Sequence, residues 1–366
     1  MEKATVRVFP MRKIADCHVH TRFLNYNGTV RMLRDIAEQG VSDACILPLP
    51  YRSCAENLFA LFVKHVYKDM NVRAFGGIHV TDRYAAVPLE KQVRALLDLG
   101  CDGIKLMFSP DLRKYYGRGI DDEAYDPMLS YLEEKGIPLN IHLADPEHYW
   151  NAGWPYSGLD LPSKESMHEE GLRMLDKHPE LRVCFAHFMF LSDSPEEAER
   201  VMEKYPCVRF DLTPGMEMYT NFDKQIERWR AFFEKYSHRI LFGTDCNIIK
   251  KCNKELESLV YRKLTEKGEF SEFCYGRECR VQGLNLSEEA VFKICYDNYF
   301  SFIGDLPKSV DVRLLCKCCR RIIDDLDREP YDEYYIRGGE LIPDLKKDPE
   351  QRIAYDFCKM ALSKLG

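Results

Sequence analysis

The sequence lacks several features that would each point to a particular class of protein. Its formal net charge is -7, so it offers no basic field to nucleic acid or to an anionic membrane. It has no apolar run near the roughly 18 residues that a membrane helix needs, and its amino terminus has no long apolar signal region. Tandem repeats and low-complexity tracts are also absent. We therefore expect a cytoplasmic globular protein that binds a small molecule, with no nucleic-acid partner and no membrane partner.

Cysteine, by contrast, is abundant, with 15 residues in the chain. Cys17, Cys45, Cys184 and Cys207 lie within apolar strand-like runs, whereas a disulfide framework would place cysteines in loops. This pattern favours a reducing compartment. The cluster Cys316–Cys319 falls in an amphipathic helical pattern, where core packing is the simpler interpretation and a soft-metal site is the alternative.

Short apolar runs alternate with helical patterns along the first two thirds of the chain. Several of the helical patterns end at a glycine, such as Gly40, Gly100 and Gly136, as expected at a helix C-terminus. The eight runs are Lys13–His18, Asp43–Leu49, Val72–His79, Asp102–Met107, Ile137–His142, Arg182–His187, Cys207–Leu212 and Arg239–Thr244. A strand followed by a helix, repeated eight times, predicts an α/β fold of the (β/α)8 TIM barrel type.

The remainder of the chain, from about Asp245, shows no strand pattern. It contains two polar stretches that we expect to be loops, near Phe273–Gly283 and at Glu329–Gly339. Helices are predicted at Lys254–Lys267, Ser287–Ile303, Val310–Asp327 and Glu350–Leu365. We predict a barrel over residues 1–304 and a C-terminal helical extension over residues 305–366 that packs on it. A separate C-terminal domain is an alternative that the pattern does not require.

Residues that commonly bind metals occur at the ends of several predicted strands. His18 and His20 are one residue apart, so in a strand both side chains project from the same face. His142 ends the fifth strand, His187 ends the sixth, and Asp245 follows the eighth. The carboxyl ends of the strands of a TIM barrel form one ring that carries the chemistry. The sequence therefore predicts a metal site there, and its imidazoles suit a divalent cation such as zinc.

Other histidines have simpler interpretations. A single histidine in a strand or helix is usually a hydrogen-bonded or packed residue, and we interpret His65 in this way. His79 ends the third predicted strand, and a pocket-lining role and a structural role are equally consistent with that position. His178 and His238 precede strands, at the face of a barrel that contributes stability and not catalysis.

The ordered set of strand-end residues resembles the amidohydrolase superfamily, in particular its TIM-barrel metal-dependent branch related to aminocarboxymuconate semialdehyde decarboxylase. The matching motifs are His18-Val19-His20, His142, His187 and Gly243-Thr244-Asp245. The resemblance covers roughly Lys13 to Gly304, and Asp297-Asn298-Tyr299-Phe300 is similar to the closing helix of the branch. It implies that residues 1–304 form a metal-dependent amidohydrolase-like barrel.

The resemblance also implies a role for each matched residue. His18, His20 and His142 would hold one divalent metal ion per chain, for which Zn2+ is the first choice. Asp245 would be a further ligand and would accept a proton from metal-bound water, whose pKa can fall to about 7. His187 would orient that water or stabilise charge on the substrate.

Lys105, on the fourth strand, is the candidate whose role depends on the number of metals. In some branches of the superfamily a lysine at this place is carboxylated and bridges two ions. In the branch that this chain resembles a single metal is usual, so Lys105 would supply positive charge near a carboxylate or a developing oxyanion. We expect the single-metal state.

Substrate recognition is expected in the loops that follow the strands. Arg22 and Arg52 carry guanidinium groups suited to a carboxylate, and Tyr149 is placed to contact a planar substrate. Further aromatic candidates are Tyr51, His148, Trp150, Trp154 and Tyr219. Each alone is typical of a surface or packing residue, and together they favour a small organic acid.

The resemblance implies a metal-dependent hydrolase of the amidohydrolase superfamily, which cleaves a C–N or C–O bond of a small carboxylated substrate with metal-activated water. The alternative is a metal-dependent non-oxidative decarboxylase that uses the same site, because the branch contains both chemistries. A binding module without catalysis is disfavoured, since no expected ligand is missing. A homo-oligomer is left open.

Overall fold

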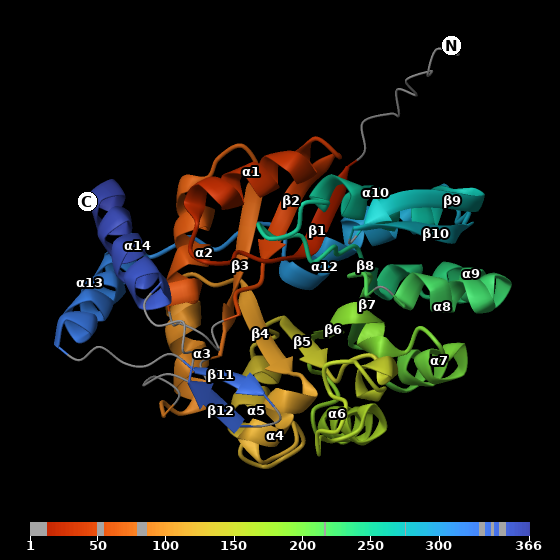
Figure 1. Cartoon of the computed structure of the whole chain (residues 1–366), viewed down its shortest axis with the longest axis horizontal. Helices are drawn as coiled ribbons and strands as arrows, with labels where there is room; N and C mark the ends of the chain where they lie inside the picture. The colour runs from red at the N-terminus through yellow and green to blue at the C-terminus, as the bar shows by residue number, and fades with distance from the viewer. Residues whose placement is uncertain are drawn as a thin grey trace, which may run out of the picture.

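Eight parallel strands, paired in chain order from β1 to β8, form the centre of the computed structural model (Figure 1). It describes residues 13–49, 55–78, 86–215, 217–274, 276–328, 334–337, 340–343 and 349–366. The strands are β1 (Ile14–Val19), β2 (Val41–Ile46), β3 (Asn71–Gly77), β4 (Gly103–Phe108), β5 (Leu139–Leu143), β6 (Val183–Phe185), β7 (Val208–Asp211) and β8 (Ile240–Leu241). Backbone hydrogen bonds from Cys17 N to Phe242 O (2.9 Å) and from His20 N to Cys246 O (2.8 Å) bring the end of β8 back to β1. The predicted (β/α)8 barrel is confirmed.

Helices cover the outside of this barrel between successive strands. They are α1 (Tyr26–Ala37), α2 (Ala55–Val66), α3 (Leu89–Asp98), α4 (Pro110–Tyr116), α5 (Asp126–Glu134), α6 (Lys164–Lys177), α7 (Pro195–Lys204), α8 (Met218–Lys224) and α9 (Ile226–Lys235). Gly40, Gly100 and Gly136 follow the ends of α1, α3 and α5 with φ values of 100°, 103° and 60°. Because few residues other than glycine adopt such angles readily, these positions end the helices as predicted.

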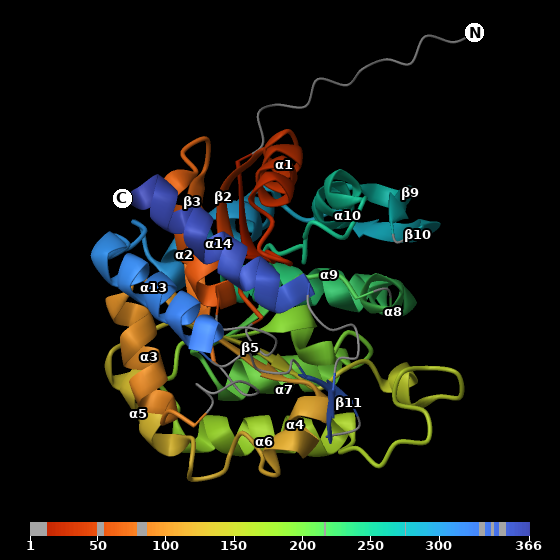
Figure 2. The ribbon, with the colours of Figure 1, turned by 60° about the vertical axis from the view of Figure 1, so that its left-hand side comes forward.

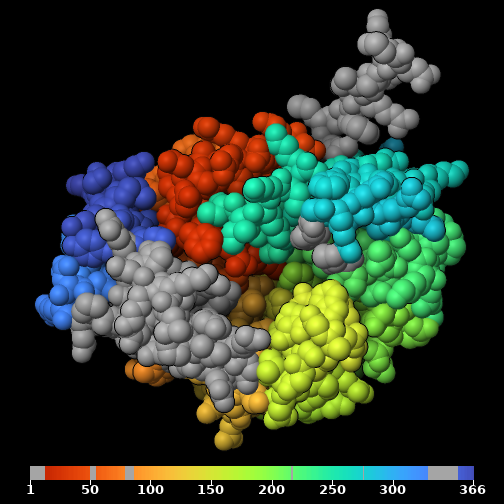
Figure 3. Space-filling view, viewed as in Figure 1, coloured from red at the N-terminus to blue at the C-terminus, as the bar shows by residue number. Residues whose placement is uncertain are grey.

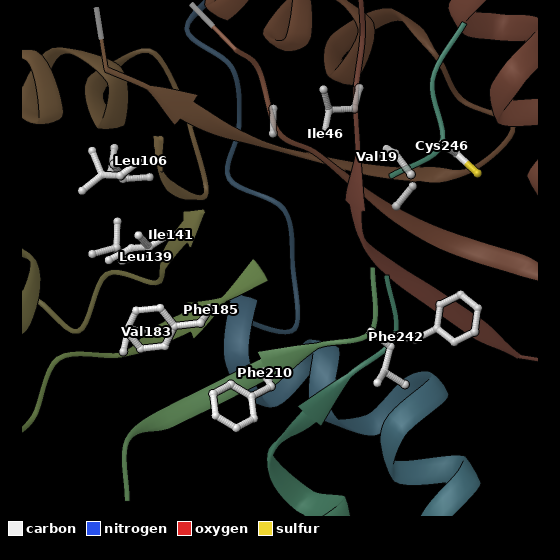
Figure 4. Packing of buried hydrophobic residues seen from close by; sticks show 14 of the residues in the cluster. Val19, Ile46, Leu106, Leu139, Ile141, Val183, Phe185, Phe210, Phe242 and Cys246 are labelled. Atoms are coloured by element: carbon white, nitrogen blue, oxygen red, sulfur yellow. The ribbon is translucent and has the colours of Figure 1, made fainter. Parts of the chain in front are cut away.

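The strands are buried on both faces, as the near-continuous apolar runs indicated. Toward the helices, side chains of neighbouring strands pack side by side, as Figure 4 shows for Leu139, Ile141 and Val183. A separate buried cluster includes Ala15, Cys17, Cys45, Leu47, Phe75, Cys184 and Leu241. The described cysteines are all free, and burial raises the pKa of the Cys17, Cys45 and Cys184 thiols well above the usual value. These thiols therefore serve as small packing groups.

The prediction that no strand follows Asp245 was wrong. Strands β9 (Lys267–Cys274) and β10 (Arg277–Leu284) form an antiparallel hairpin where we predicted a loop. The hairpin contacts α8, α9 and α10 (Asn253–Thr265). Only Phe270 and Cys274 of β9 are buried, so the strand has almost none of the apolar alternation that sequence patterns detect.

A second hairpin lies within the other stretch that we expected to be irregular. It consists of β11 (Tyr334–Arg337) and β12 (Glu340–Pro343), and it contacts α4. The predicted connection at Glu329–Gly339 was therefore wrong for these strand residues. Two short antiparallel strands give little periodic signal on their own.

The predicted C-terminal helices are present with small shifts at their ends. Helix α11 (Glu288–Phe292) continues through a π-helical turn (Lys293–Asp297) into α12 (Asn298–Ile303), followed by α13 (Val312–Arg328) and α14 (Pro349–Leu365). Helices α13 and α14 contact each other and α2 (Figure 2). Cys316 and Cys319 are buried in α13, as the packing interpretation requires. The division into residues 1–304 and 305–366 stays a prediction. In the described part of the chain, no helix is long and apolar enough to cross a membrane.

Asn298 explains how the closing helix attaches to the barrel. Its side-chain amide donates to Ser237 O (2.6 Å) and Ile240 O (2.7 Å), at the start of β8. The side chain is buried and therefore needs such partners. This contact positions β8, the short last strand of the barrel, and Asp245 lies a few residues after its end.

Candidate metal centre

Three side chains from the carboxyl ends of β1 and β8 bring one ligand atom each to a common point. His18, His20 and Asp245 offer ligand atoms that all lie within 4.8 Å of one another. The two Nε2 atoms are 3.1 Å apart, and His20 Nε2 lies 3.0 Å from Asp245 Oδ1. His18 is 1% exposed and His20 is 4% exposed. The sequence analysis placed all three at this site.

The hydrogen bonds of the other ring nitrogens determine what these Nε2 atoms can do. His20 Nδ1 lies 2.5 Å from the carbonyl oxygen of Leu47, and His18 Nδ1 lies 2.9 Å from Asp211 Oδ2. Both partners are acceptors, so each Nδ1 carries the hydrogen. Burial lowers the pKa of His20 to about 4 and also lowers that of His18. In the neutral rings, the two Nε2 lone pairs therefore face each other and the Asp245 carboxylate, an arrangement that a cation satisfies.

Asp245 is held in an unusual backbone conformation and in a charged state. Its φ is 57°, in the left-handed region, and its amide donates to His18 O (2.8 Å). Lys250 Nζ lies 2.5 Å from its Oδ2. Burial acts to raise the pKa of Asp245, but the Lys250 ammonium and the His20 imidazole hold it well below its usual range. Lys250 was missed by the sequence analysis, because a single lysine in a loop carries no spacing signal.

Asp211, at the end of β7, is the second residue that the sequence analysis missed. It is 0% exposed. Its Oδ2 accepts from His18 Nδ1 (2.9 Å) and Asn140 Nδ2 (3.3 Å), and its Oδ1 accepts from the amides of His187 (2.9 Å) and Thr213 (3.2 Å). Such a partner holds a ligating imidazole in one tautomer and orientation. It lies one residue before the end of the predicted strand Cys207–Leu212, but its role depends on contacts with His18 and His187, which no sequence motif records.

His187 follows β6 in a strained left-handed turn. Residues 187–190 have φ values of 53°, 57°, 52° and 53°, although none of them is glycine. Each such residue costs roughly 1–2 kcal/mol, so surrounding contacts must hold the turn. Besides the amide bond to Asp211, His187 Nδ1 lies 3.2 Å from Thr213 O and the ring stacks on Phe190 at 5.2 Å between centroids. The predicted strand Arg182–His187 thus ends early, at Phe185.

His142 lies at the end of β5, beside His187 and not within the group of three ligand atoms. The two rings are 4.9 Å apart between centroids. His142 Nε2 lies 3.2 Å from Asp145 Oδ1, and the Tyr156 hydroxyl donates to Asp145 Oδ2 at 2.5 Å. Ligation by His142, through Nδ1 or through Nε2 once it leaves Asp145, therefore stays a prediction.

Lys105 is buried beneath the site on β4 and is 2% exposed. Its Nζ donates to Asn140 Oδ1 at 2.6 Å. Burial lowers its pKa to about 8, although the nearby Asp211 carboxylate opposes this change. At neutral pH the side chain is therefore mostly an ammonium, the state that we predicted for a single-metal site.

Two of the predicted substrate contacts border the metal centre. The Nε of Arg22 is buried and has no hydrogen-bond partner among the described residues, and its positive charge adds to the burial that lowers the pKa of His20. Burial, with Asp145 and then Glu217 and Asp245, raises the pKa of the Tyr149 phenol to about 12. Both side chains therefore lie near the acidic and imidazole groups of the site.

The other predicted contacts divide into three groups. Trp154 stacks on Tyr149 at 5.8 Å and contacts His148, within a loop that also contains Trp150. Tyr219 is buried in the hydrophobic core and donates to Leu212 O (2.8 Å). Arg52, Tyr51 and His79 lie outside the described residues. In the space-filling view, the surface is hollowed between the red segment after β1 and the yellow segment after β5 (Figure 3).

Comparison with known proteins identifies the family of the chain and finds solved structures with a similar fold. A family model described as amidohydrolase matches residues 15–298. A search of curated protein sequences found no match.

Solved structures that are similar to this chain include the following three, each of which overlaps 80% of it. An uncharacterised TIM-barrel protein from Bordetella bronchiseptica is 17% identical, with 100% of its length covered and a TM-score of 0.52. A 2,6-dihydroxybenzoate decarboxylase from Rhizobium is 15% identical, with 99% covered and a TM-score of 0.51. A dihydroxybenzoic acid decarboxylase from Polaromonas, with bound manganese and 2-nitroresorcinol, is 13% identical, with 97% covered and a TM-score of 0.50. At these identities the likeness shows the fold alone.

Proposed function

We propose that this chain, which belongs to the amidohydrolase family, is a metal-dependent enzyme that hydrolyses a C–N or C–O bond of a small carboxylated substrate. The observation that carries the proposal is the pair of Nε2 lone pairs, 3.1 Å apart and beside the Asp245 carboxylate. Two neutral imidazoles and one carboxylate are a donor set that suits Zn2+. His142 would supply a third nitrogen.

A divalent cation held there would polarise the substrate and lower the pKa of a water molecule. The residues of the chain would perform the remaining tasks. Asp245, kept ionised by Lys250 and His20, would accept the proton of the attacking water. Lys105 would stabilise negative charge that develops on the substrate, as a buried ammonium does best where water is excluded.

His187 and Arg22 would position the substrate. Because His187 Nδ1 lies against the carbonyl of Thr213, it is the nitrogen that carries the hydrogen, and Nε2 is left to accept a proton or a hydrogen bond. The guanidinium of Arg22 would bind the substrate carboxylate. Tyr149 and the aromatic loop beside it would pack on a planar substrate.

A second candidate function is non-oxidative decarboxylation at the same site. The observation in its favour is the buried Nε of Arg22 near His20, which has no hydrogen-bond partner in the part of the chain that the structure describes. A guanidinium in that place could hold a carboxylate close to the ligand imidazoles, where a decarboxylase needs its scissile group. Hydrolysis and decarboxylation differ in their products, so one screen separates them.

The test uses the full chain expressed with added zinc, and in parallel with added manganese. Elemental analysis should find about one ion per chain, in line with a single three-to-four-ligand site. Amides, lactones and aromatic or unsaturated carboxylic acids are then screened for hydrolysis products and for released carbon dioxide. His18→Ala and His20→Ala should remove the metal, whereas His65→Ala, which changes a histidine outside the site, should retain it. Full activity in metal-free protein would overturn the proposal.

A further inference from the structure

A cavity of about 440 Å³ lies beside the metal centre, where β3 and β4 stop pairing. The last paired residues of the two strands are Gly77 and Lys105. Strand β4 continues to Phe108 along β5, but on its β3 side the described residues provide no further partner. From this end of β4 the described lining of the cavity extends to α3 and to the turn before α5.

The described lining of this cavity is mostly nonpolar. Ile78, Leu89, Leu106, Phe108 and Met128 are among the residues that surround it. Such a surface gains by contact with nonpolar groups, because those groups leave water when they bind.

Three charged residues are among the described residues that line the cavity, and each has a partner elsewhere. Lys105, at its inner end, donates from Nζ to Asn140 Oδ1 at 2.6 Å. Glu90 accepts from Arg94 at 2.6 Å, and Arg118 lies 3.7 Å from Asp122. The hydroxyl of Tyr116 donates to Met107 O at 3.3 Å. Because these polar groups are already paired, the cavity favours a nonpolar ligand group over a charged one.

The inner end of the cavity adjoins the metal centre on two sides. Pro48 lines the cavity and directly follows Leu47, whose carbonyl oxygen lies against His20 Nδ1. Met107 lines it and is paired in register with His142 of β5. These two neighbours place the cavity next to the imidazoles, at the distance of one residue along the chain after β2 and one strand across the sheet.

We propose that this cavity is a substrate subsite, and that the substrate is an amphipathic carboxylic acid derivative with a ring or chain beyond the reacting bond. The inference rests on the proposed function, since it assigns the carboxylate to Arg22 and the reacting bond to the metal centre. A volume of about 440 Å³ lies in the range of roughly 300–1,000 Å³ that pockets for small organic ligands occupy. The cavity would thus bind the nonpolar part of the substrate, on the far side of the reacting bond from the carboxylate.

The experiment measures binding of a series of unbranched carboxylates, from butanoate to decanoate, to the zinc-loaded full chain by isothermal titration. Each buried CH2 group strengthens binding by about fourfold, so affinity should rise along the series until the cavity is full. Equal affinity for all members in the wild-type protein would overturn the proposal.

Two variants test whether the cavity causes this rise. Ala124→Trp places a large ring in it from an exposed turn residue, and Val87→Glu places a charge in it from a partly exposed one. Both should abolish the dependence on chain length and leave butanoate binding unchanged. Ala95→Trp, an exposed α3 position that is not among the lining residues, is the matched control and should behave as wild type. A rise that persists in both cavity variants would show that the chains bind elsewhere.

The subsite and the proposed function can fail separately. Suppose that the protein binds no metal and turns over no substrate, but its affinity for carboxylates still depends on chain length. This result would contradict the proposed function and support the subsite. Turnover of compact substrates by a zinc-loaded protein with no chain-length dependence would contradict the subsite alone. Circular dichroism of each variant confirms that the barrel is folded before the titrations are interpreted.

Discussion

Two pairs of histidines meet at the top of this barrel, and they are held in different ways. His18 and His20 belong to the end of one strand, and each Nδ1 is fixed by a buried acceptor at the end of another strand of the barrel. His142 pairs with Asp145 in its own loop, and His187 sits in a strained left-handed turn. The first pair is positioned by the sheet and the second by loops. We therefore expect the β1 half of the site to be preorganised and the β5–β6 half to adjust when metal or substrate binds.

The largest effect is expected from Asp245→Asn. This variant removes the carboxylate from the β1 half of the site and leaves the imidazoles of His18 and His20 in place. A carboxamide cannot accept the proton of the attacking water, and loss of a general base costs roughly 10²–10⁴ in kcat. Metal content, measured by elemental analysis, should change far less than kcat. Asp98→Asn on the exposed face of α3 is the control. Near-normal kcat with metal bound would show that Asp245 is not the proton acceptor.

Lys105→Ala should have the next largest effect and also tests the number of metals. Loss of one charge-stabilising donor in a buried site lowers kcat/KM by roughly 10²–10³. Metal content should remain near one per chain, and added bicarbonate should have no effect on activity. The exposed Lys91→Ala is the control. A stoichiometry near two that falls in Lys105→Ala would instead indicate a carboxylated lysine that bridges two ions, with His187 as a ligand.

The pH dependence of the free energy of unfolding tests how strongly His20, in the β1 half of the site, is desolvated. Folded His20 binds a proton only below about pH 4, whereas the unfolded side chain has its usual pKa of 6.5. Between these values the unfolded chain binds more protons, so the His20 contribution is complete above pH 6.5 and is lost as the pH falls toward 4. The loss amounts to about 3 kcal/mol, because each pKa unit corresponds to roughly 1.4 kcal/mol.

Denaturant unfolding of the metal-free protein at pH 7 and pH 4 measures this contribution as the difference between wild type and His20→Gln. The difference isolates His20 from other groups that titrate in the same range, such as Asp16, whose pKa is raised to about 7 by burial. His65→Gln, at a half-buried helix position outside the site where burial also lowers the pKa, should change the pH dependence less than His20→Gln does. Equal pH dependence in wild type and His20→Gln would mean that His20 is solvated like a surface histidine.

Asp211→Asn should have the smallest of these effects and links the two halves. The variant removes the charged acceptor of His18 Nδ1 but keeps an oxygen that can accept from the His187 amide. Loss of such an orienting group typically weakens metal binding by roughly 10–100-fold. Competition with a chelator measures the affinity, and thermal unfolding is measured beside it. Reduced stability with unchanged metal affinity would assign Asp211 a purely structural role.

Most of the barrel could be predicted, because eight buried strands leave eight apolar runs, each followed by an amphipathic helix. The hairpin β9–β10 could not be predicted, since its residues are largely exposed and only one face touches α8, α9 and α10. Packing against those helices stabilises it, and no local pattern records that packing.

In the site, too, some residues could be predicted from the sequence and others could not. The spacing of His18 and His20 implies a shared face in any strand, and the barrel brings Asp245 to them through the β1–β8 closure. Asp211 and Lys250 are single residues without a spacing motif, and their roles depend on contacts between segments that are far apart in the sequence or within an irregular loop.

The sequence by itself determined the (β/α)8 order, the family, and the residues that could bind a metal, because these depend on residue type and local periodicity. Only the tertiary structure decided which nitrogen of each imidazole carries its hydrogen, that His142 pairs with Asp145, and that a nonpolar cavity opens between β3 and β4. The physical reason is that hydrogen-bond partners and cavities are made by segments distant along the chain. Their distances depend on how the whole barrel packs.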